Sequence, residues 1–161
     1  MTSGAVATLM QVLLWARLHA AYPGRVPSVP PVCVASASRL YSLPPAILWA
    51  VLDTEGGEIG QAVRYRNGTY DIGPMQINSS WLPLLRDSFG IGPYELAYDP
   101  CLNVATGAWI LKRYMLESGD FWRGVARYHN GNPRLGLPYA LKIWTKVLRN
   151  ASYAQAHGEH R

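Results

Sequence analysis

The chain has 161 residues, of which 49% are hydrophobic and 16% are charged, a composition typical of one folded domain and not of a disordered chain. Fifteen Lys and Arg residues against ten Asp and Glu give a net charge of +5, which favours contact with an acidic polymer or surface without selecting one. The two cysteines, Cys33 and Cys101, are too few for a disulfide-dense small protein or a zinc site of four thiolates.

Residues 1–22 are predicted to form a signal peptide or an apolar N-terminal segment. The run from Gly4 to Trp15 is nearly uncharged and too short to span a bilayer, and His19-Ala20-Ala21 offers small residues for cleavage. A basic start is missing, so an amphipathic first helix or a misplaced start codon is the alternative. The remaining predicted divisions are a Pro-rich tether at 23–32, one domain at 33–150 and a short polar tail at 151–161.

Most of the signals after residue 36 are helical, with one hairpin signal at Asn67-Gly68 between two strand-like runs. The sequence therefore predicts an α+β domain that is predominantly α-helical and contains one small β-hairpin. Caps, prolines and glycines place the helices at Pro44-Pro45 to Gly56-Gly57, Asn78 to Leu85, Asp99-Pro100 to about Glu117, Asp120 to His129, and Leu137 to Arg149.

Glu55 is the leading candidate for chemistry because of its position. It shares a helical stripe with Leu48, Val51 and Leu52, so its carboxyl group is expected on the core side. It also lies in the last turn, where burial and the negative end of the helix dipole both raise the pKa of a carboxyl. A general acid needs this property. A structural glutamate paired with an arginine or with backbone amides is the alternative.

Other acidic residues are less suited to catalysis. Asp53 lies two positions before Glu55, on another helix face that is expected to be solvated. Asp71 is expected to bond hairpin amides, as Asp commonly does in turns. No second carboxylate is clearly placed for a two-carboxylate glycosidase.

Several other classes of protein find no support in the sequence. It contains no Gly-x-Ser-x-Gly motif, phosphate-binding glycine loop or His-Glu-x-x-His helix. The four histidines show no metal-ligand spacing, so no metal or cofactor is expected, and His129 is expected at the surface or the rim of a site. The basic residues are scattered, so nucleic acid is not an expected partner.

An ordered set of motifs surrounds Glu55 over most of the chain. The motifs are Glu55, Asn67-Gly68-Thr69-Tyr70-Asp71-Ile72-Gly73, Met75-Gln76-Ile77-Asn78, Trp81, Asp99-Pro100-Cys101-Leu102-Asn103 and Gly107-Ala108-Trp109-Ile110-Leu111. With these motifs, the sequence from about Cys33 to Leu148 resembles the lytic transglycosylase catalytic domain, glycoside hydrolase family 23, which has a lysozyme-like fold. The resemblance is strongest to the small enzymes that accompany type IV secretion, conjugation and pilus systems.

The resemblance implies a mechanism and a set of site residues. Glu55 would protonate the glycosidic oxygen between N-acetylmuramic acid and N-acetylglucosamine and then take a proton from the muramoyl 6-hydroxyl, leaving a 1,6-anhydro end. Gln76, Asn78 and Tyr128 would line the substrate cleft, with Met75 as an apolar wall. Hairpin and cap bonding is the alternative role for Gln76 and Asn78.

Two positions depart from the family pattern. The family commonly has Glu-Ser-Gly where this chain has Glu55-Gly56-Gly57, so any hydroxyl contact from that serine is lost. The later Tyr-Asn-x-Gly motif appears as Tyr128-His129-Asn130-Gly131, which places a histidine where the family has the asparagine.

The resemblance also implies a disulfide between Cys33 and Cys101, and with it export to the periplasm or cell envelope. In the cytosol both cysteines would be free thiols. The expected partners are peptidoglycan glycan strands and components of a type IV secretion, conjugation or pilus system, and we expect a monomer. The leading hypothesis is a lytic transglycosylase that opens the cell wall locally. The alternatives are a lysozyme-type hydrolase on the same fold and a weakly catalytic wall-binding assembly component.

Overall fold

The computed structural model describes the backbone of residues 29–158 and the side chains of residues 29–150. The predicted signal segment (1–22) and most of the predicted tether (23–32) lie outside the described residues. Among the helices of the described range, none is both long enough and apolar enough to cross a membrane.

The described chain forms helices along most of its length, with short strands only between α3 and α4. The α+β, predominantly helical class is confirmed. In chain order the elements are α2 (Pro31–Tyr41), α3 (Pro45–Glu55), β1 (Ala62–Arg64), β2 (Tyr70–Ile72), β3 (Ile77–Asn78), the 3-10 helix η1 (Ser79–Trp81), α4 (Leu82–Phe89), α5 (Pro93–Tyr98), α6 (Pro100–Ser118), α7 (Phe121–His129) and α8 (Pro133–Gly158).

Local signals explain where these helices begin and end. The side chain of Asp99 accepts a hydrogen bond from the N–H of Leu102 at the start of α6, and Asp120 accepts one from Arg123 at the start of α7. α3 ends at Gly56, whose φ of 63° lies in the left-handed region that glycine adopts without strain. The predicted helices α3, α6 and α7 are confirmed.

The three strands form one antiparallel sheet in the order β1-β2-β3. β1 and β2 flank the Asn67-Gly68 turn, so the predicted hairpin is confirmed. β3 was not predicted, because two residues are too few to show a strand periodicity. The register pairs Asp71, in the middle strand, with Val63 on one side and Asn78 on the other.

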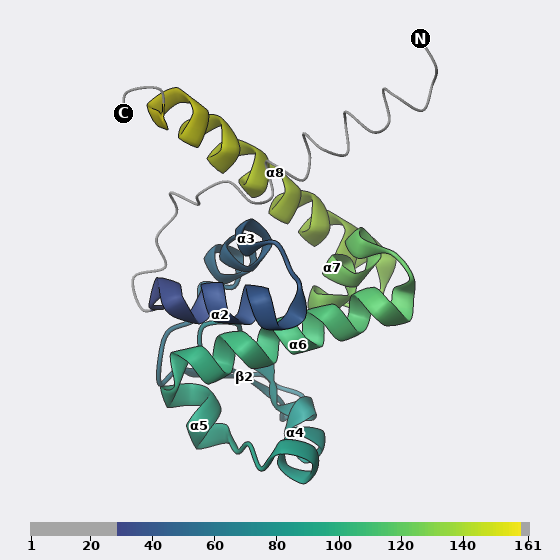
Figure 1. The fold of residues 1–161 in the computed structure, drawn as a ribbon. Helices are drawn as coiled ribbons and strands as arrows, with labels where there is room; N and C mark the ends of the chain where they lie inside the picture. Colours follow the sequence, from purple (N-terminus) through teal and green to yellow (C-terminus); the bar gives the residue numbers. More distant parts are fainter. Residues whose placement is uncertain (1–28, 159–161) are drawn as a thin grey trace.

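Helix α6 crosses the middle of the molecule and packs against α2 and α7, while α8 packs against α3 and α7 (Figure 1). The sheet, α4 and α5 lie on the opposite side of α6 from α2 and α3 (Figure 1). Side chains that are fully buried, such as Ile47 and Leu52 of α3, Leu111 of α6 and Ile143 of α8, form the core between these helices. The helices and the sheet therefore meet along α6. The C-terminal ends of α3 and α7 lie at one cleft, which the sheet and α6 also line.

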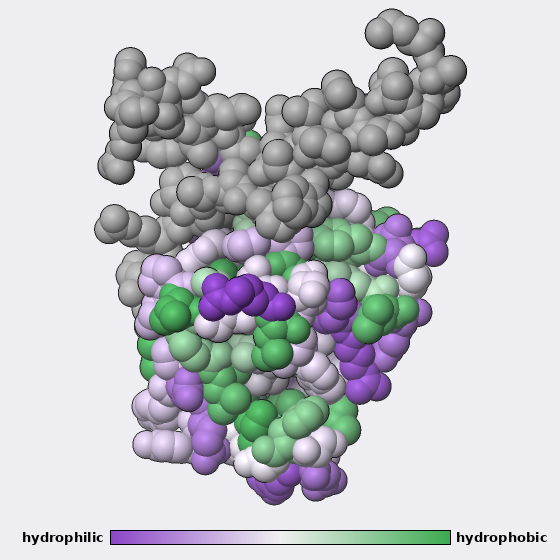
Figure 2. All heavy atoms as spheres, viewed as in Figure 1, coloured by the Kyte–Doolittle hydropathy of each residue, from purple (hydrophilic) through white to green (hydrophobic). Residues whose placement is uncertain are grey.

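The surface over α2 and α6 mixes hydrophobic and hydrophilic residues (Figure 2). Leu40 and Phe89 are among the exposed hydrophobic residues of the described chain, at 68% and 55% exposure. Isolated apolar side chains on a surface are ordinary.

Three helices differ from the sequence prediction. α2 begins at Pro31, inside the predicted tether, because proline is favoured in the first turn of a helix. The backbone of α8 remains helical to Gly158, through most of the predicted polar tail. α5, which has six residues, was too short to predict from periodicity.

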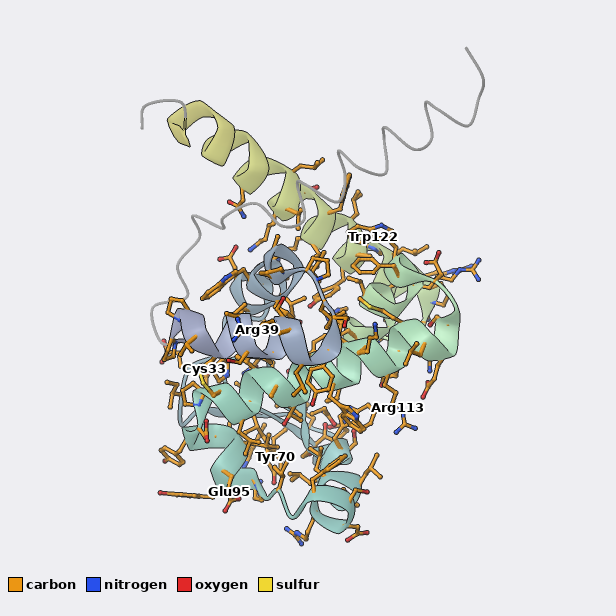
Figure 3. The ribbon with its side chains drawn as sticks, viewed as in Figure 1. Cys33, Arg39, Tyr70, Glu95, Arg113 and Trp122 are labelled. Atoms are coloured by element: carbon orange, nitrogen blue, oxygen red, sulfur yellow. A yellow bond between two sulfur atoms is a disulfide. The ribbon has the colours of Figure 1, made fainter. Side chains whose placement is uncertain are left out.

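A disulfide joins Cys33 of α2 to Cys101 of α6, with 4.5 Å between the two Cα atoms (Figure 3). The predicted pairing is confirmed. The bond closes a loop with a sequence separation of 68 and ties the first described helix to the central one.

We expect the double variant Cys33→Ser/Cys101→Ser to lose about 4 kcal/mol of unfolding free energy, because a long loop in the unfolded chain is no longer closed. Guanidinium denaturation of the variant and of oxidised wild type measures the difference. Wild type under reducing conditions is the matched control and should behave like the double variant. Equal denaturation midpoints for oxidised wild type and the double variant would contradict the prediction.

Candidate active site

A polar cleft of about 340 Å³ brings together the ends of α3 and α7, the sheet and one face of α6. The predicted site residues Glu55, Gln76, Asn78 and Tyr128 all line it. The full lining is Glu55, Asp71, Gln76, Ile77, Asn78, Ser80, Trp81, Ile110, Tyr114, Arg127, Tyr128, His129, Asn130 and Gly131.

Glu55 is the last residue of α3 and is half-buried in this cleft. Burial raises the pKa of its carboxyl from 4.5 to about 7. A hydrogen bond from Tyr139 and the positive charge of Lys142 lower this pKa, while the negative charge of Asp71 raises it. The direction agrees with the one inferred from the helical position. At neutral pH a large share of Glu55 keeps its proton.

Tyr139 of α8 holds the Glu55 carboxyl by donating its hydroxyl hydrogen to Oε1 over 2.5 Å. The tyrosine is 6% exposed, and burial raises its pKa well above the usual range, so it remains a neutral donor. The ring of His129 stacks on it, with 4.8 Å between centroids and 4° between planes. Sequence reasoning missed Tyr139. The only signal was its place in a predicted helix, 84 positions from Glu55.

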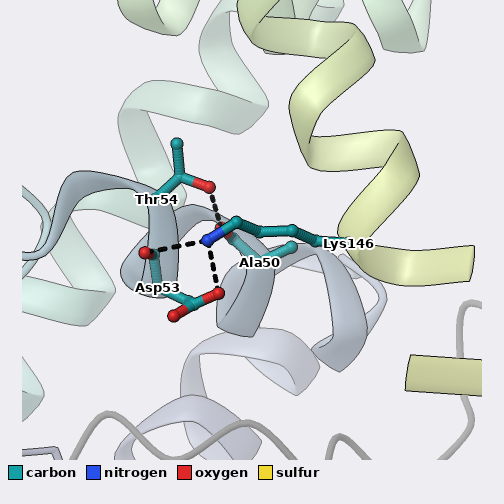
Figure 4. Close-up of polar contacts among 4 residues, drawn as sticks. All are labelled: Ala50, Asp53, Thr54 and Lys146. Carbon is teal, nitrogen blue, oxygen red and sulfur yellow. Dashed lines mark hydrogen bonds and ion pairs between the residues drawn. The ribbon is translucent and has the colours of Figure 1, made fainter. Parts of the chain in front are cut away.

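A second contact between α8 and α3 lies about two turns further along α8. Nζ of Lys146 donates to the backbone oxygen of Asp53 over 3.0 Å and forms an ion pair with Oδ2 of the same residue (Figure 4). In the same turn, the hydroxyl of Thr54 donates to the backbone oxygen of Ala50 over 2.7 Å (Figure 4). The last turn of α3 is therefore held by α8 at two points, which restricts where the Glu55 carboxyl can lie.

The double glycine after Glu55 has two separate structural roles. Gly56 has a positive φ and ends the helix, and no heavy atom lies near the position of an added Cβ. A Cβ on Gly57 would collide with the backbone oxygen of Gly73 and the side chain of Gln76. The departure from the family's Glu-Ser-Gly thus falls where a side chain has space, and the sterically required glycine is present.

The structure places a second carboxylate in the cleft, which the sequence did not reveal. Asp71 lines it, and its charge raises the pKa of Glu55. Its Oδ2 accepts from the hydroxyl of Tyr65 over 2.6 Å and its Oδ1 from Nδ2 of Asn78 over 2.8 Å. The expectation of bonds to hairpin amides is corrected, because both partners are side chains, one directly after β1 and the other in β3. The bond to Asp71 raises the pKa of Tyr65 to about 12.

Gln76 and Asn78 line the cleft and also make hairpin and cap hydrogen bonds, the role that the sequence offered as the alternative to substrate binding. Gln76 has a φ of 48°, unusual for a residue with a side chain, and its Nε2 donates to the backbone oxygen of Gly73 over 2.9 Å. Oδ1 of Asn78 accepts from the N–H of Ser80 at the start of η1. Each side chain is therefore oriented before any ligand binds.

Met75 does not line the cleft. Its side chain is fully buried, and Gly107 of α6 packs so closely against it that an added Cβ would overlap it. The expected apolar wall is therefore not formed by Met75, because its side chain turns into the core. Its backbone oxygen instead accepts from the hydroxyl of Tyr128 over 2.9 Å, which orients that tyrosine in the cleft wall.

Asn103 of α6 supports the cleft from behind and was not singled out as a site residue. It is fully buried, and its Nδ2 donates to the backbone oxygens of Ile72 (3.0 Å) and Leu96 (2.9 Å). Its Oδ1 accepts from the N–H of Met75 over 2.8 Å. One amide side chain thus joins β2, α5 and the segment that leads to Gln76. Its place in the Asp99–Asn103 motif was the available signal.

Within the described residues, no group of three or more His, Cys, Asp or Glu side chains could hold a metal ion. The chemistry that this arrangement offers is acid/base catalysis. A half-buried carboxyl with a pKa near 7 faces a polar cleft beside a small sheet in a helical domain. A carboxyl of this kind over a polar cleft is suited to acid/base chemistry such as the cleavage of glycosidic bonds.

Comparison with known proteins gives the family. The family model described as "Transglycosylase SLT domain" matches residues 32–140. The chain is 33% identical over 117 residues to "Invasion protein IagB" of Salmonella typhimurium (strain SL1344), covering 70% of this chain and 72% of the relative. It is 28% identical over 128 residues to "Peptidoglycan-binding-like protein" of Escherichia coli O157:H7, covering 73% and 77%. It is 33% identical over 100 residues to "X polypeptide" of Escherichia coli (strain K12), covering 62% and 59%.

The chain therefore belongs to the transglycosylase SLT domain family, whose members are lytic transglycosylases. Its substrate is peptidoglycan, which implies an extracytoplasmic place of action.

Proposed function

We propose that Glu55 is the acid/base of this lytic transglycosylase. Its protonated carboxyl donates to the oxygen of the β-1,4 bond between N-acetylmuramic acid and N-acetylglucosamine as the bond to the muramoyl anomeric carbon breaks. The carboxylate then takes the proton of the muramoyl 6-hydroxyl, whose oxygen bonds to that carbon. Glu55 ends protonated, as it began, and the product carries a 1,6-anhydro-muramoyl end.

The observation that supports this proposal is the environment of Glu55: a half-buried carboxyl in a polar cleft, bonded to Tyr139, with a pKa raised to about 7. A pKa near the working pH lets one group act as acid and then as base. Because the nucleophile belongs to the substrate, no activated water is needed, and the reaction becomes intramolecular.

This mechanism predicts the pH dependence of cleavage. We expect kcat/KM on soluble glycan strands to fall as the pH rises above about 7, because Glu55 loses the proton that it must donate. Tyr139→Phe removes a hydrogen bond that lowers the pKa of Glu55, so the falling limb should move to higher pH. Tyr94→Phe, at a 69% exposed tyrosine of α5, is the matched control and should leave the limb in place. A limb that moves to lower pH in Tyr139→Phe would contradict the assignment.

We further propose that Gln76, Asn78 and Tyr128 bind the sugar on the two sides of Glu55. All three line the cleft, and each has an internal hydrogen bond that sets the direction of its polar atoms. Such preorientation lowers the entropy that substrate binding must overcome. Met75 has no direct substrate role in this proposal.

A lysozyme-type hydrolase is the second candidate, and the position of Asp71 is the observation that favours it. In a hydrolase a second carboxylate activates water or stabilises the positively charged sugar. Both carboxylate oxygens of Asp71 already accept bonds from Tyr65 and Asn78, which favours a charge-stabilising or structural role over proton abstraction. The transglycosylase therefore remains the proposal that the site supports best.

Mass spectrometry of the muropeptides released from purified sacculi separates these functions. Anhydro-muramoyl ends from the wild type support the proposal, and reducing ends in their place would establish the hydrolase. The absence of any release by the folded wild type would instead favour the wall-binding assembly component.

We also propose that the enzyme is exported, acts as a monomer in the periplasm or envelope, and opens the wall locally for a secretion, conjugation or pilus apparatus. A relative named as an invasion protein and the Cys33–Cys101 disulfide support this setting. Cell fractionation with mass spectrometry of the mature N-terminus tests export. Recovery of the uncleaved chain in the cytosol with two free thiols would contradict it. Light scattering tests whether the enzyme is a monomer. The secretion or conjugation rate of a deletion strain tests the role in opening the wall for such an apparatus.

A further inference from the structure

One wall of the cleft combines aromatic rings with arginines in a way that the acid/base chemistry does not require. Trp81 of η1 and Tyr114 of α6 line the cleft. The Cζ of Arg113 lies 5.7 Å from the centroid of the Trp81 ring, and the Cζ of Arg127 lies 4.7 Å from the centroid of Tyr114. We call Trp81, Tyr114, Arg113, Glu117 and Arg127 the cation–aromatic wall.

Glu117 holds both arginines of this wall. Its Oε1 accepts from Nε of Arg113 over 2.7 Å, and its Oε2 lies 3.2 Å from Nη2 of Arg127. Two guanidinium groups against one carboxylate leave the wall with one net positive charge. Of the two arginines, only Arg127 lines the cleft.

Arg127 is held in place but not enclosed. Its face rests on Tyr114, one edge meets Glu117, and 39% of its side chain remains exposed. A guanidinium has five N–H donors in a planar fork, which matches the two oxygens of a carboxylate. Stacking and the ion pair restrict the side chain before a ligand arrives, so a carboxylate meets donors that are already oriented.

Neutral sugar hydroxyls and acetamido groups do not need a cation, whereas peptidoglycan has carboxylates next to its muramoyl rings. They belong to the stem peptide or, where the peptide is absent, to the lactyl group. We propose that Arg127 binds one of these carboxylates and makes the cleft selective for muramoyl-containing glycans over neutral N-acetylglucosamine polymers. The inference rests on the proposed function in one respect, that the glycan lies in this cleft.

The test measures binding, so that it does not depend on cleavage. The full chain carrying Glu55→Gln is titrated calorimetrically with three soluble oligosaccharides of equal length: a peptide-bearing muropeptide glycan, its peptide-free form and an N-acetylglucosamine oligomer. We expect adding Arg127→Gln to raise the Kd for at least one of the two muramoyl ligands about tenfold. The Kd for the neutral oligomer should not change, and Arg127→Lys should restore part of the affinity.

Arg123→Gln, on the same helix and outside the cleft lining, is the matched control and should leave all three Kd values unchanged. An effect confined to the peptide-bearing ligand assigns the stem-peptide carboxylate, and one confined to the peptide-free ligand assigns the lactyl carboxylate. An equal loss for the neutral oligomer, or no loss for either muramoyl ligand, would overturn the inference. If the wild type formed no anhydro products, the proposed mechanism would be wrong, but the Kd values would still test carboxylate binding by Arg127. The two proposals can therefore be contradicted independently.

Discussion

Glu55→Gln is expected to lower the rate of muropeptide release from sacculi by about a thousandfold or more, because the group that exchanges the proton is lost. Glutamine has nearly the same size and can still accept the hydrogen bond from Tyr139, so the cleft should keep its shape. Chromatography of the soluble products against time measures the rate.

The same variant is expected to be more stable than the wild type at alkaline pH. The pKa of Glu55 in the folded chain is about 7, above its ordinary 4.5, so the unfolded chain loses the proton first as the pH rises. Wild-type stability therefore falls across the window between these two values, by about 3 kcal/mol. Glutamine does not ionise. Denaturant unfolding of both proteins below and above this window should show the difference only above it.

Asp53→Asn is the matched control, because it removes a negative charge from the same turn of α3 without touching the cleft lining. It breaks an exposed ion pair with Lys146, which is worth at most about 1 kcal/mol. The bond from Nζ of Lys146 to the backbone oxygen of Asp53 does not involve the carboxylate and still joins this turn to α8, so cleavage should stay near the wild-type rate. Release at the wild-type rate by Glu55→Gln would show that the acid has been assigned to the wrong residue.

Asn103→Leu is expected to lower the unfolding free energy by about 4 kcal/mol, as much as loss of the disulfide, because three buried backbone groups lose their partner at once. Leucine has the same number of side-chain heavy atoms and the same branching, so the substitution opens no cavity, and its bulkier methyl groups add a packing cost to that of the unsatisfied polar groups. Cleavage should fall as well, since the segment that Asn103 holds leads to Gln76. Urea denaturation and the rate of muropeptide release measure the two effects.

Asn132→Ala provides the comparison for this result. Asn132 is exposed, and its Oδ1 accepts from the N–H of Arg134 at the start of α8. Loss of this cap should cost only about 1 kcal/mol and leave cleavage unchanged. If Asn103→Leu were no more destabilising than Asn132→Ala, the hydrogen bonds of Asn103 to β2, α5 and the Met75 backbone would not be what stabilises this part of the fold.

Much of the fold could be predicted because its signals are local. Gly56 ends α3, Asp99 and Asp120 cap α6 and α7, and Asn67-Gly68 turns the hairpin, each through bonds within a few residues. Periodicity alone also placed Glu55 on the core side of its helix. The extension of α8 to Gly158 was not predicted, and no glycine or proline interrupts the chain between Pro138 and Gly158.

The environment of Glu55 could be predicted only in part. The direction of its pKa followed from its place in α3, because burial and the helix end act within that element. Its bond to Tyr139 and its proximity to Asp71 depend on how α8 and the sheet pack against α3. Met75 shows the same limit, because its place in the motif suggested a cleft wall and packing against Gly107 turned its side chain inward.

The sequence by itself determined the helical class, the ends of most elements, the acidic residue at the end of α3 and the family motifs around it. These depend on backbone preferences and hydrogen bonds between neighbours in the chain. Only the tertiary structure decided that Tyr139 reaches Glu55, that Arg127 joins Tyr114 on the cleft wall and that Asn103 supports the cleft from behind. Such contacts join segments whose relative position follows from the packing of the whole core, and no local pattern records them.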